Sequence, residues 1–428
     1  MSTSLVWELL HWGPLLIATG CSFVYFRDLG DVTQAIMSVE RKNMLYAIRN
    51  ENKMIALGLG GTALAAVLHF TVGAGVGWVF NTLAIANVVM IAFVWGWLHI
   101  GLRNQQNHAS FYSIEEADDW VRGDESVIVI DNKGEARAHP DYHIKRPHLA
   151  GTPEGLGGEN VIITYCCMTH LGHGFKPEIE GEKLDLEVLA QHGNNLIMKD
   201  MATGEPIQQV YGTRERDGRY SEKKMQEWPT YRMPYKAFKK AFPEGKVFLN
   251  KIPKFTQNPF LWLVDNIVEQ VFLWGTIPHD RTESLLFETL DVDDKRLRRK
   301  EYVWGFNVGQ DSVAYTEDFI RENNNLINVV VGDREIVVTY DPDFDSVGVY
   351  YNDSGQAISD INFWGESDQG KLARVETVKA GLYWCVWANF YPETDLNRLA
   401  VAAENSNTES PADQCADQGD KPAGQQVA

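Results

Sequence analysis

The chain has 428 residues, of which 44% are hydrophobic and 23% charged, and this is enough for a sizeable core in two or three domains. Its formal net charge of −19 argues against a protein that follows a nucleic-acid backbone, because such binding needs a strongly basic surface. We therefore expect no nucleic-acid partner. The five cysteines, at positions 21, 166, 167, 385 and 415, include no CxxC pair, so a disulfide framework is not expected either.

The first 106 residues predict a membrane segment. Between Lys53 and Arg103 the sequence has no charged residue, and a glycine-rich break at 71–77 divides it into two apolar halves, each about the ~20 residues that a membrane-spanning helix needs. A third apolar run ends at Arg27. A signal peptide is the alternative for this run, but it lacks a positively charged start. The predicted transmembrane helices are therefore 7–26, 54–72 and 77–101.

The flanking charges predict which way the helices cross. The connection between the first two helices carries Arg27, Arg41, Lys42, Arg49 and Lys53, and the residues before it carry no lysine or arginine. Under the positive-inside rule this connection is cytoplasmic, and so is everything after the third helix. We expect an integral membrane protein with a cytoplasmic soluble domain and the membrane as its partner.

Each predicted helix contains one histidine, at positions 11, 69 and 99. In an antiparallel arrangement His11 and His69 lie at a similar depth, and His99 lies near the other face. Ionisable residues inside a membrane are candidates for function, for example as haem or metal ligands. His11 and His69 are therefore candidate cofactor ligands. The alternative is that they belong to the interfacial aromatic belt beside Trp12 and Trp95.

Beyond residue 106 the sequence predicts an α+β fold, a β-rich soluble domain built from two related half-domains. The hairpin pattern at 127–138 recurs at 303–314, and the strand Val161–Tyr165 has a counterpart in Ile336–Tyr340. Two repeated patterns in the same order indicate an internal duplication. We expect half-domains at 107–275 and 276–397, followed by a disordered acidic tail at 398–428.

The stretch TYCCMTHLGHGF, residues 164–175, contains the strongest chemical signal. Thiolate, imidazole and thioether ligands together favour copper or zinc over magnesium or calcium. The predicted metal site consists of Cys166, His170, His173 and His148, with Met168 as a weak ligand and His143 as a substitute. One alternative is a strand end with a buried thiol and surface imidazoles. Another is a cysteine nucleophile activated by a histidine.

Three functions follow from these alternatives. The first is a membrane-anchored metal-binding protein that handles electrons or copper, with its site in the first half-domain. The second is a non-catalytic accessory or scaffold subunit of a membrane complex. It would use a surface of small residues on the second helix, which includes Gly58, Gly60 and Gly61, and a predicted amphipathic helix at 260–274, which could lie on the membrane surface, on a partner or on the domain's own sheet. The third is a cysteine-dependent enzyme that uses Cys166.

Residues 110–397 resemble the domain of unknown function family 3179. The resemblance rests on Gly134–Pro140 at the end of a hairpin, a following histidine at 148, Ile163–Cys166, Asp200–Gly204 and Phe390–Thr394. The family's second cysteine falls on Thr169 here, so its CxxC is absent. The resemblance implies a fold and an extracytoplasmic domain, which differs from the charge-based placement, and it implies no reaction.

Overall fold

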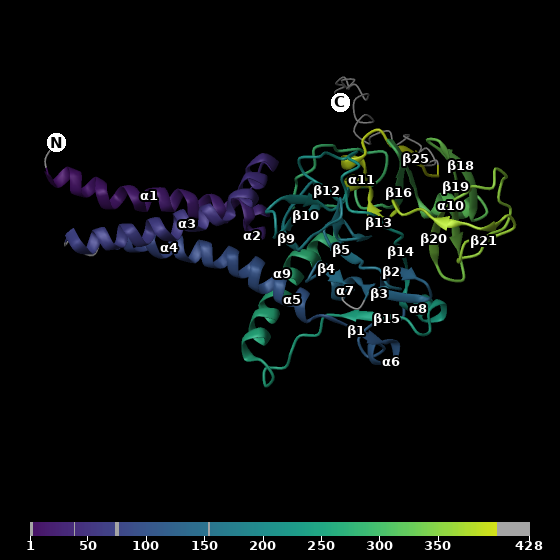
Figure 1. Ribbon diagram of the computed structural model, residues 1–428, viewed down its shortest axis with the longest axis horizontal. Coiled ribbons are helices and arrows are strands. Elements are labelled where there is room, and N and C mark those ends of the chain that lie inside the picture. Colours follow the sequence, from purple (N-terminus) through teal and green to yellow (C-terminus); the bar gives the residue numbers. More distant parts are fainter. Residues whose placement is uncertain (1–2, 38, 73–76, 153–154, 400–428) are drawn as a thin grey trace, which may run out of the picture.

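The computed structural model describes residues 3–37, 39–72, 77–152 and 155–399. Figure 1 shows a helical bundle that extends from one end of a β-rich body. The predicted tail lies outside the described residues, apart from its first two positions. The glycine-rich break predicted between the second and third helices is likewise outside them for residues 73–76.

The bundle contains three long helices: α1 (Thr3–Leu29), α3 (Arg41–Val72) and α4 (Trp78–Trp95). A short helix α2 (Asp31–Gln34) follows α1, and α4 continues as the π-helical turn η1 (Gly96–Leu102) and as α5 (Arg103–His108). The three predicted spans fall within these elements. However, α3 begins well before the predicted span, at Arg41. Its first turns are polar and contact the β-rich body, for example where Arg41 binds Gln208 and Glu215. Its 32 residues make a helix roughly 48 Å long, more than the hydrocarbon core of a bilayer requires.

Glycines on α3 allow close helix packing inside the bundle. A Cβ atom at Gly58 would lie 2.5 Å from Ile91 Cδ1, and one at Gly61 would lie 3.1 Å from the Cβ atom of Ala18. Small residues let transmembrane backbones approach in this way. Gly58 and Gly61 are thus used within the chain, whereas a Cβ atom at Gly60 would meet nothing within 4 Å.

Three described helices are long and apolar enough to cross a membrane: Arg41–Thr71, Trp78–Asn107 and Pro259–Arg281. They mark the chain as a membrane protein. The third, α9 (Pro259–Arg281), was not predicted as a span. Helix α1 packs along α3 and α4. The chain enters α9 from the β-rich body and returns to that body after it, so α9 lies alongside the body instead of crossing a bilayer.

The first part of the β-rich body contains a five-stranded and a four-stranded sheet. The five-stranded sheet has the order β1-β15-β3-β2-β14, with β1 (Ser110–Ser113), β15 (Lys246–Leu249), β3 (Glu135–Pro140), β2 (Ser126–Asn132) and β14 (Tyr231–Pro234). The other has the order β13-β6-β5-β4, with β13 (Glu227–Trp228), β6 (Leu171–Phe175), β5 (Ile162–Cys166) and β4 (Leu149–Gly151). Strands β2 and β3 form the predicted hairpin, whose turn places Gly134 at a φ of 87°. Helix α7 (Asp141–Ile144) follows β3, and α8 (Tyr235–Ala241) connects β14 to β15.

The second part repeats this strand order. One sheet has the order β24-β16-β17-β25, with β24 (Lys379–Tyr383), β16 (Tyr302–Val308), β17 (Asp311–Tyr315) and β25 (Asp395–Asn397). The other has the order β18-β19-β20-β23, with β18 (Leu326–Val331), β19 (Arg334–Asp341), β20 (Ser346–Tyr351) and β23 (Ala373–Arg374). As in the first part, the hairpin β16–β17 is antiparallel and its second strand pairs in parallel with the last strand. Helix α10 (Glu317–Glu322) follows β17, and α11 (Trp384–Phe390) connects β24 to β25.

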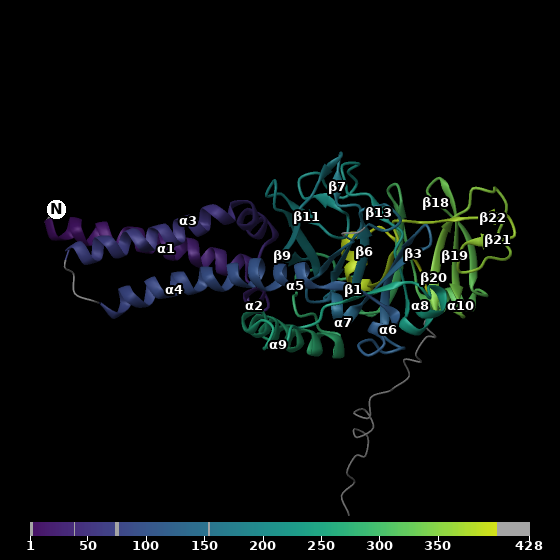
Figure 2. The ribbon, with the colours of Figure 1, turned by 60° about the horizontal axis from the view of Figure 1, so that its bottom comes forward.

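A further sheet lies between β6 and β13 in the sequence. Its order is β12-β11-β10-β9, with β9 (Leu186–His192), β10 (Asn195–Asp200), β11 (Pro206–Gln208) and β12 (Thr213–Arg214). Strands β9 and β11 contact α3, and β9 contacts η1. In Figures 1 and 2 this sheet is the part of the body nearest the bundle. We call it the docking sheet. The second part has no four-stranded sheet at the corresponding place. Among the described residues, that place holds only a two-stranded hairpin of β21 (Glu366–Ser367) and β22 (Gly370–Lys371).

A buried polar cluster joins the bundle to the docking sheet. Glu51 of α3 accepts hydrogen bonds from Tyr25 Oη at 2.9 Å and Lys199 Nζ at 2.8 Å, and its Oε1 lies 2.9 Å from His99 Nε2. The other ring nitrogen of His99 lies 2.7 Å from Glu187 Oε2. Glu51 is 2% exposed and Lys199 is 6% exposed, so each charge depends on its partners for the solvation that burial removes.

Replacing Lys199 by methionine should therefore lower the free energy of unfolding by about 3 kcal/mol, because the buried Glu51 would lose its lysine and keep only His99 and Tyr25 as partners. Chemical unfolding of the full chain in a mild detergent measures this. The control is Lys42→Met, which removes a cation from the exposed Lys42–Glu40 pair and should cost less than about 1 kcal/mol. Equal losses in the two variants would contradict the structural role of the cluster.

Candidate functional site

The stretch from Thr164 to Phe175 forms a hairpin made of β5, a four-residue turn and β6. Thr169 holds the turn: its Oγ1 donates to Cys166 O at 3.0 Å and accepts from Leu171 N at 3.0 Å. The last turn residue, His170, adopts a left-handed backbone with a φ of 60°. The residue that replaces the family's second cysteine, Thr169, thus has a structural role in the turn.

Two thiols, a thioether and an imidazole line one cavity of about 80 Å³ at the base of the bundle. They belong to Cys166, Cys167, Met168 and His148. The remaining walls are largely apolar and come from η1, the docking sheet, α9 and the segment after it, with Trp97, Val188, Leu196, Phe272 and Phe287 among them. The cavity therefore gathers Cys166, Met168 and His148 of the predicted metal site, and adds Cys167.

The imidazole of His148 is fixed in one tautomer. Its Nδ1 lies 2.9 Å from Tyr165 O, and because a carbonyl oxygen only accepts, Nδ1 must carry the proton and Nε2 the lone pair. Burial lowers the pKa of His148 to about 4, so the ring is neutral at pH 7. His148 also has a φ of 57°, a strained conformation of a kind that is concentrated at functional sites.

Both thiols are protonated at neutral pH. Burial raises the pKa of Cys166 to about 11 and raises that of Cys167 well above its ordinary value. A cysteine nucleophile needs a lowered pKa instead. Cys166 Sγ donates a hydrogen bond to Asn194 O at 3.7 Å. These observations argue against a cysteine nucleophile. They argue less strongly against a metal site, since a metal ion can displace the proton of a thiol.

His170 lies outside this cavity. Its Nε2 lies 3.0 Å from Asp141 Oδ2, and its Nδ1 lies 2.9 Å from Gly381 O in β24. Arg232 NH1 also binds Asp141, at 2.8 Å, and Arg232 NH2 donates to His170 O at 2.8 Å. With both ring nitrogens engaged, His170 connects the first and second parts of the body and has no lone pair to offer to a metal.

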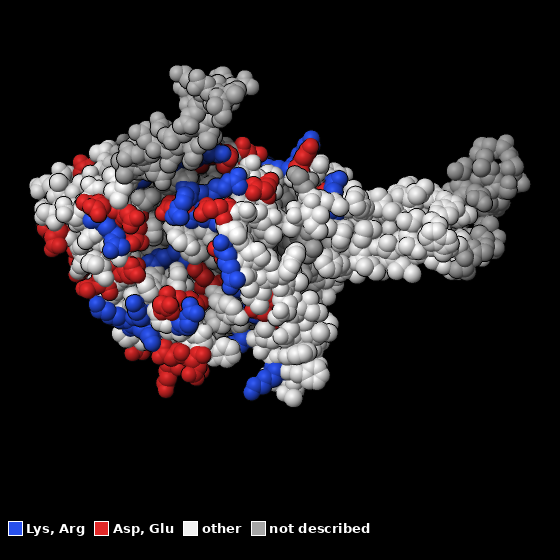
Figure 3. All heavy atoms as spheres, turned by 180° about the vertical axis from the view of Figure 1, so that it is seen from behind, with Lys and Arg blue, Asp and Glu red and all other residues white. Residues whose placement is uncertain are grey.

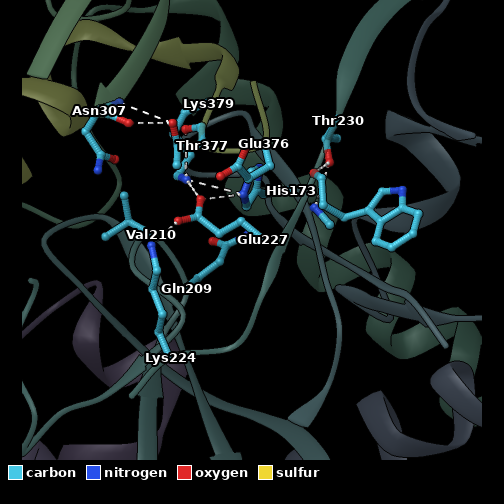
Figure 4. Close-up of polar contacts among 12 residues, drawn as sticks. His173, Gln209, Val210, Lys224, Glu227, Thr230, Asn307, Glu376, Thr377 and Lys379 are labelled. Carbon is cyan, nitrogen blue, oxygen red and sulfur yellow. Dashed lines mark hydrogen bonds and ion pairs between the residues drawn. The ribbon is translucent and has the colours of Figure 1, made fainter. Parts of the chain in front are cut away.

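His173 belongs to a second buried cluster, shown in Figure 4. Its Nε2 lies 2.8 Å from Glu227 Oε2, and Lys379 Nζ binds the same carboxylate and lies 3.2 Å from His173 Nε2. Burial lowers the pKa of His173 to about 4 and also lowers the pKa of Lys379. Burial alone would raise the pKa of Glu227, but the charge of Lys379 and the contact with His173 lower it overall.

His11 and His69 lie together inside the bundle, as the antiparallel arrangement predicts. Their ring centroids are 5.3 Å apart, and His69 stacks on Phe80 at 4.0 Å. The proposed substitute ligand His143 is buried in α7, where its ring contacts Tyr142 and Trp120, and it does not line the cavity. Among the described residues, no three or more His, Cys, Asp or Glu side chains form a group that could hold a metal.

The chain belongs to the family described as protein of unknown function DUF3179, whose model matches residues 106–394. This confirms the resemblance drawn from the sequence motifs. No curated protein and no solved structure matches the chain.

Sequence reasoning missed several partners of these histidines. Asp141, Arg232, Glu227 and Lys379 are isolated charges in the sequence, and no spacing signals that they meet. The helix α9 was predicted, because its apolar residues are interrupted by Asp265 and Glu269, a pattern that indicates an amphipathic helix.

The buried Lys379–Glu227 pair leads to a stability prediction. Lys379→Met should reduce the free energy of unfolding by about 3 kcal/mol, because the buried Glu227 would keep only the partly exposed Lys224, at 3.0 Å, as its cation. The double variant Lys379→Met, Glu227→Leu should recover most of this loss, since a pair of apolar residues can replace a buried ion pair. Chemical unfolding measures both. No recovery in the double variant would mean that the cluster has a further role.

Buried histidines also predict loss of stability in acid. Burial lowers the pKa of six histidines from 6.5 to about 3 or 4, namely His139, His143, His148, His173, His192 and His279. Between pH 6.5 and 4 the unfolded chain binds protons that the folded chain does not, so stability falls as the pH falls. The loss should be about 1.4 kcal/mol per pH unit for each fully titrating histidine. Unfolding measured from pH 7 to pH 4 tests this, and a flat profile would contradict it.

Proposed function

We propose that this protein is a membrane-anchored copper(I)-binding protein whose site is the cavity lined by His148, Cys166, Cys167 and Met168. The observation that carries the proposal is that the four residues that bear these donors line one small and largely apolar cavity. Cys166, Cys167 and His148 do not converge on one point, so a bound ion would have to draw their side chains together. Thiolates bind copper(I) and zinc, and a thioether among the ligands favours copper(I). His148, neutral and with its lone pair on Nε2, adds a ligand of the kind copper accepts.

The donor set favours copper over the predicted alternative, zinc. A structural zinc site needs four Cys or His ligands in tetrahedral arrangement, and His170 and His173 are engaged elsewhere in the body. Copper(I) accepts thioether ligands such as Met168. The hydrogen bond from His148 Nδ1 to Tyr165 O is also the usual outer partner of a metal-bound imidazole.

The position of the cavity supports a role at the membrane surface. α9 forms one wall and turns an apolar face outward: Phe260, Leu263, Ile267 and Trp274 are 58%, 51%, 52% and 66% exposed. Its buried face carries Glu269, which pairs with buried Arg146 at 2.7 Å. Figure 3 shows that the uncharged surface of the bundle continues onto this helix. An apolar face of this kind fits the interface of a bilayer.

We also infer that the two parts of the β-rich body arose by duplication. The matching strand orders, and the matching helices α8 and α11, support this inference. The hairpin β5–β6 then corresponds to β19–β20, and Cys166 corresponds to Asp341. In the second copy Asp341 Oδ1 accepts from Asp343 N and Phe344 N, which is ordinary turn chemistry. The soft donors are thus particular to the first copy.

Competition between the full chain and a colorimetric copper(I) chelator, under reducing conditions, tests the proposal. Cys166→Ser should weaken copper(I) binding by at least about 100-fold. Loss of an outer-shell partner of a ligand typically weakens metal binding by about 10- to 100-fold, and loss of the ligand itself should weaken it more. The matched controls are Cys385→Ser, a buried thiol elsewhere in the fold, and His170→Gln. Both should bind as the unchanged chain does.

Equal copper affinity in Cys166→Ser and Cys385→Ser would contradict the proposal. The same titration with zinc decides between the two metals, and we expect zinc to bind more weakly than copper. Tight zinc binding that depends on His170 or His173 would restore the ligand set predicted from the sequence.

The pKa values also predict how copper binding depends on pH. Because Cys166 is protonated below a pKa of about 11, each copper ion must displace its proton. The affinity should therefore rise about tenfold per pH unit between pH 6 and 9 for each proton released. Repeating the competition across this range measures the slope, and a pH-independent affinity would show that no thiolate binds the metal.

A further inference from the structure

Two histidines lie side by side at the end of the bundle that points away from the β-rich body. His11 is in the third turn of α1 and His69 is in the last turn of α3, and Figure 2 shows that α1 begins at this far end. Their ring centroids are 5.3 Å apart, with an angle of 65° between the ring planes. Both residues are buried, with exposures of 4% and 3%. Two imidazoles thus meet in an otherwise apolar part of the bundle.

The imidazole of His69 is buried without a hydrogen-bond partner. Neither of its ring nitrogens has one among the described residues. Its stacking on Phe80, at 4.0 Å, involves the face of the ring and leaves both nitrogens unused. Buried polar groups in native proteins almost always have a partner, and an ionisable side chain inside a membrane segment indicates a functional site. The unused nitrogens therefore indicate a ligand that binds there.

Aromatic rings from two further positions crowd around the pair. Phe80 of α4 stacks on His69 with the ring planes 12° apart, and its centroid lies 6.1 Å from that of His11. Trp12 packs edge-on against Phe80 at 5.6 Å. A haem would have to displace these rings, whereas a single ion between the two imidazoles would not. The packing therefore favours a metal ion over a planar cofactor.

The number and kind of ligands select the metal. An imidazole nitrogen binds a first-row metal at about 2 Å, so two such nitrogens on one ion lie at most roughly 4 Å apart, which side-chain rotation of the neighbouring rings allows. Among the described residues, no third His, Cys, Asp or Glu forms a metal-binding group with the pair. Zinc sites need at least three protein ligands, and magnesium and calcium need oxygen ligands. Copper(I) accepts imidazole and is stable with two ligands in a line.

The position of the pair gives an ion access from water. Trp78, the first residue of α4, is 79% exposed, and the ring of Trp12 lies 5.9 Å from that of His11. Tryptophan concentrates at the interface between lipid and water, so this end of the bundle lies at a membrane boundary. An ion can reach the pair from that face without crossing the bilayer.

We propose that His11 and His69 bind one copper(I) ion at the end of the bundle opposite the β-rich body. One ring nitrogen of each histidine gives its lone pair to the ion, and the other keeps its proton, so both imidazoles stay neutral and no electron is transferred. The proposal goes beyond the copper site of the cysteine cavity and does not depend on it, because neither histidine lines that cavity.

Copper(I) titration of the full chain in a mild detergent, in competition with a colorimetric chelator under reducing conditions, counts the ions bound per chain. We expect His69→Leu and His11→Leu each to bind one ion fewer than the unchanged chain. The double variant should lose no more than either single variant, because both residues hold the same ion. Leucine suits the apolar bundle, and circular dichroism checks that the helices remain. X-ray absorption at the copper edge should show that the lost ion has nitrogen neighbours and no sulfur.

The matched control is His192→Gln, which changes a buried histidine of the docking sheet and should bind as many ions as the unchanged chain does. An unchanged count in both leucine variants would overturn the proposal, and so would an equal loss in the control. A lost ion with sulfur neighbours would overturn it as well. If the unchanged chain binds a single ion, with nitrogen neighbours only, and His69→Leu removes it, this proposal stands and the copper site of the cysteine cavity does not.

Discussion

The packing of the helical bundle against the β-rich body depends on the contacts of one buried carboxylate, that of Glu51. It lies on a transmembrane helix and binds Tyr25 of α1, His99 of η1 and Lys199 of the docking sheet. A buried charge is stable only with such partners, so the three helices and the sheet must meet in one geometry. That geometry places η1 beside the cavity that holds the soft donors.

The docking sheet explains why only one of the two similar parts of the body contacts the membrane segment. It lies between β6 and β13, where the second part has only a small two-stranded hairpin among the described residues. It supplies Lys199 and Glu187 to the junction, and it forms one wall of the cysteine cavity. The same region also accounts for the cations between the first helices: Arg41 binds Glu215 at 2.5 Å, and Arg49 approaches Glu205. Since the body binds two of the five cations in this connection, their number is a weak guide to sidedness, and both placements of the soluble domain stay predictions.

The histidines show how far spacing alone can define a site. His148, His170 and His173 are close in sequence to Cys166, and all of them are ordered parts of the same region. Successive residues of a strand point to opposite faces, and the turn before β6 rotates the chain again. His148 therefore meets the thiols, His170 meets Asp141, and His173 meets Glu227. The spacing of the three histidines in the sequence cannot distinguish these environments, because each is formed by segments that are distant in sequence.

The sequence by itself determined the apolar spans, the recurrence of the hairpin and strand patterns, the family, and the Cys-Cys-Met group that follows the first of the two similar strands, where Asp-Pro follows the second. These are local properties, since hydrophobic length, alternation and turn residues act over a few neighbouring positions. Only the tertiary structure decided which donors share a cavity, that α9 lies beside the body with its apolar face outward, and that Glu51, Lys199 and His99 meet. The physical reason is that burial and electrostatic pairing depend on the neighbours in space, and a single sequence does not list those neighbours.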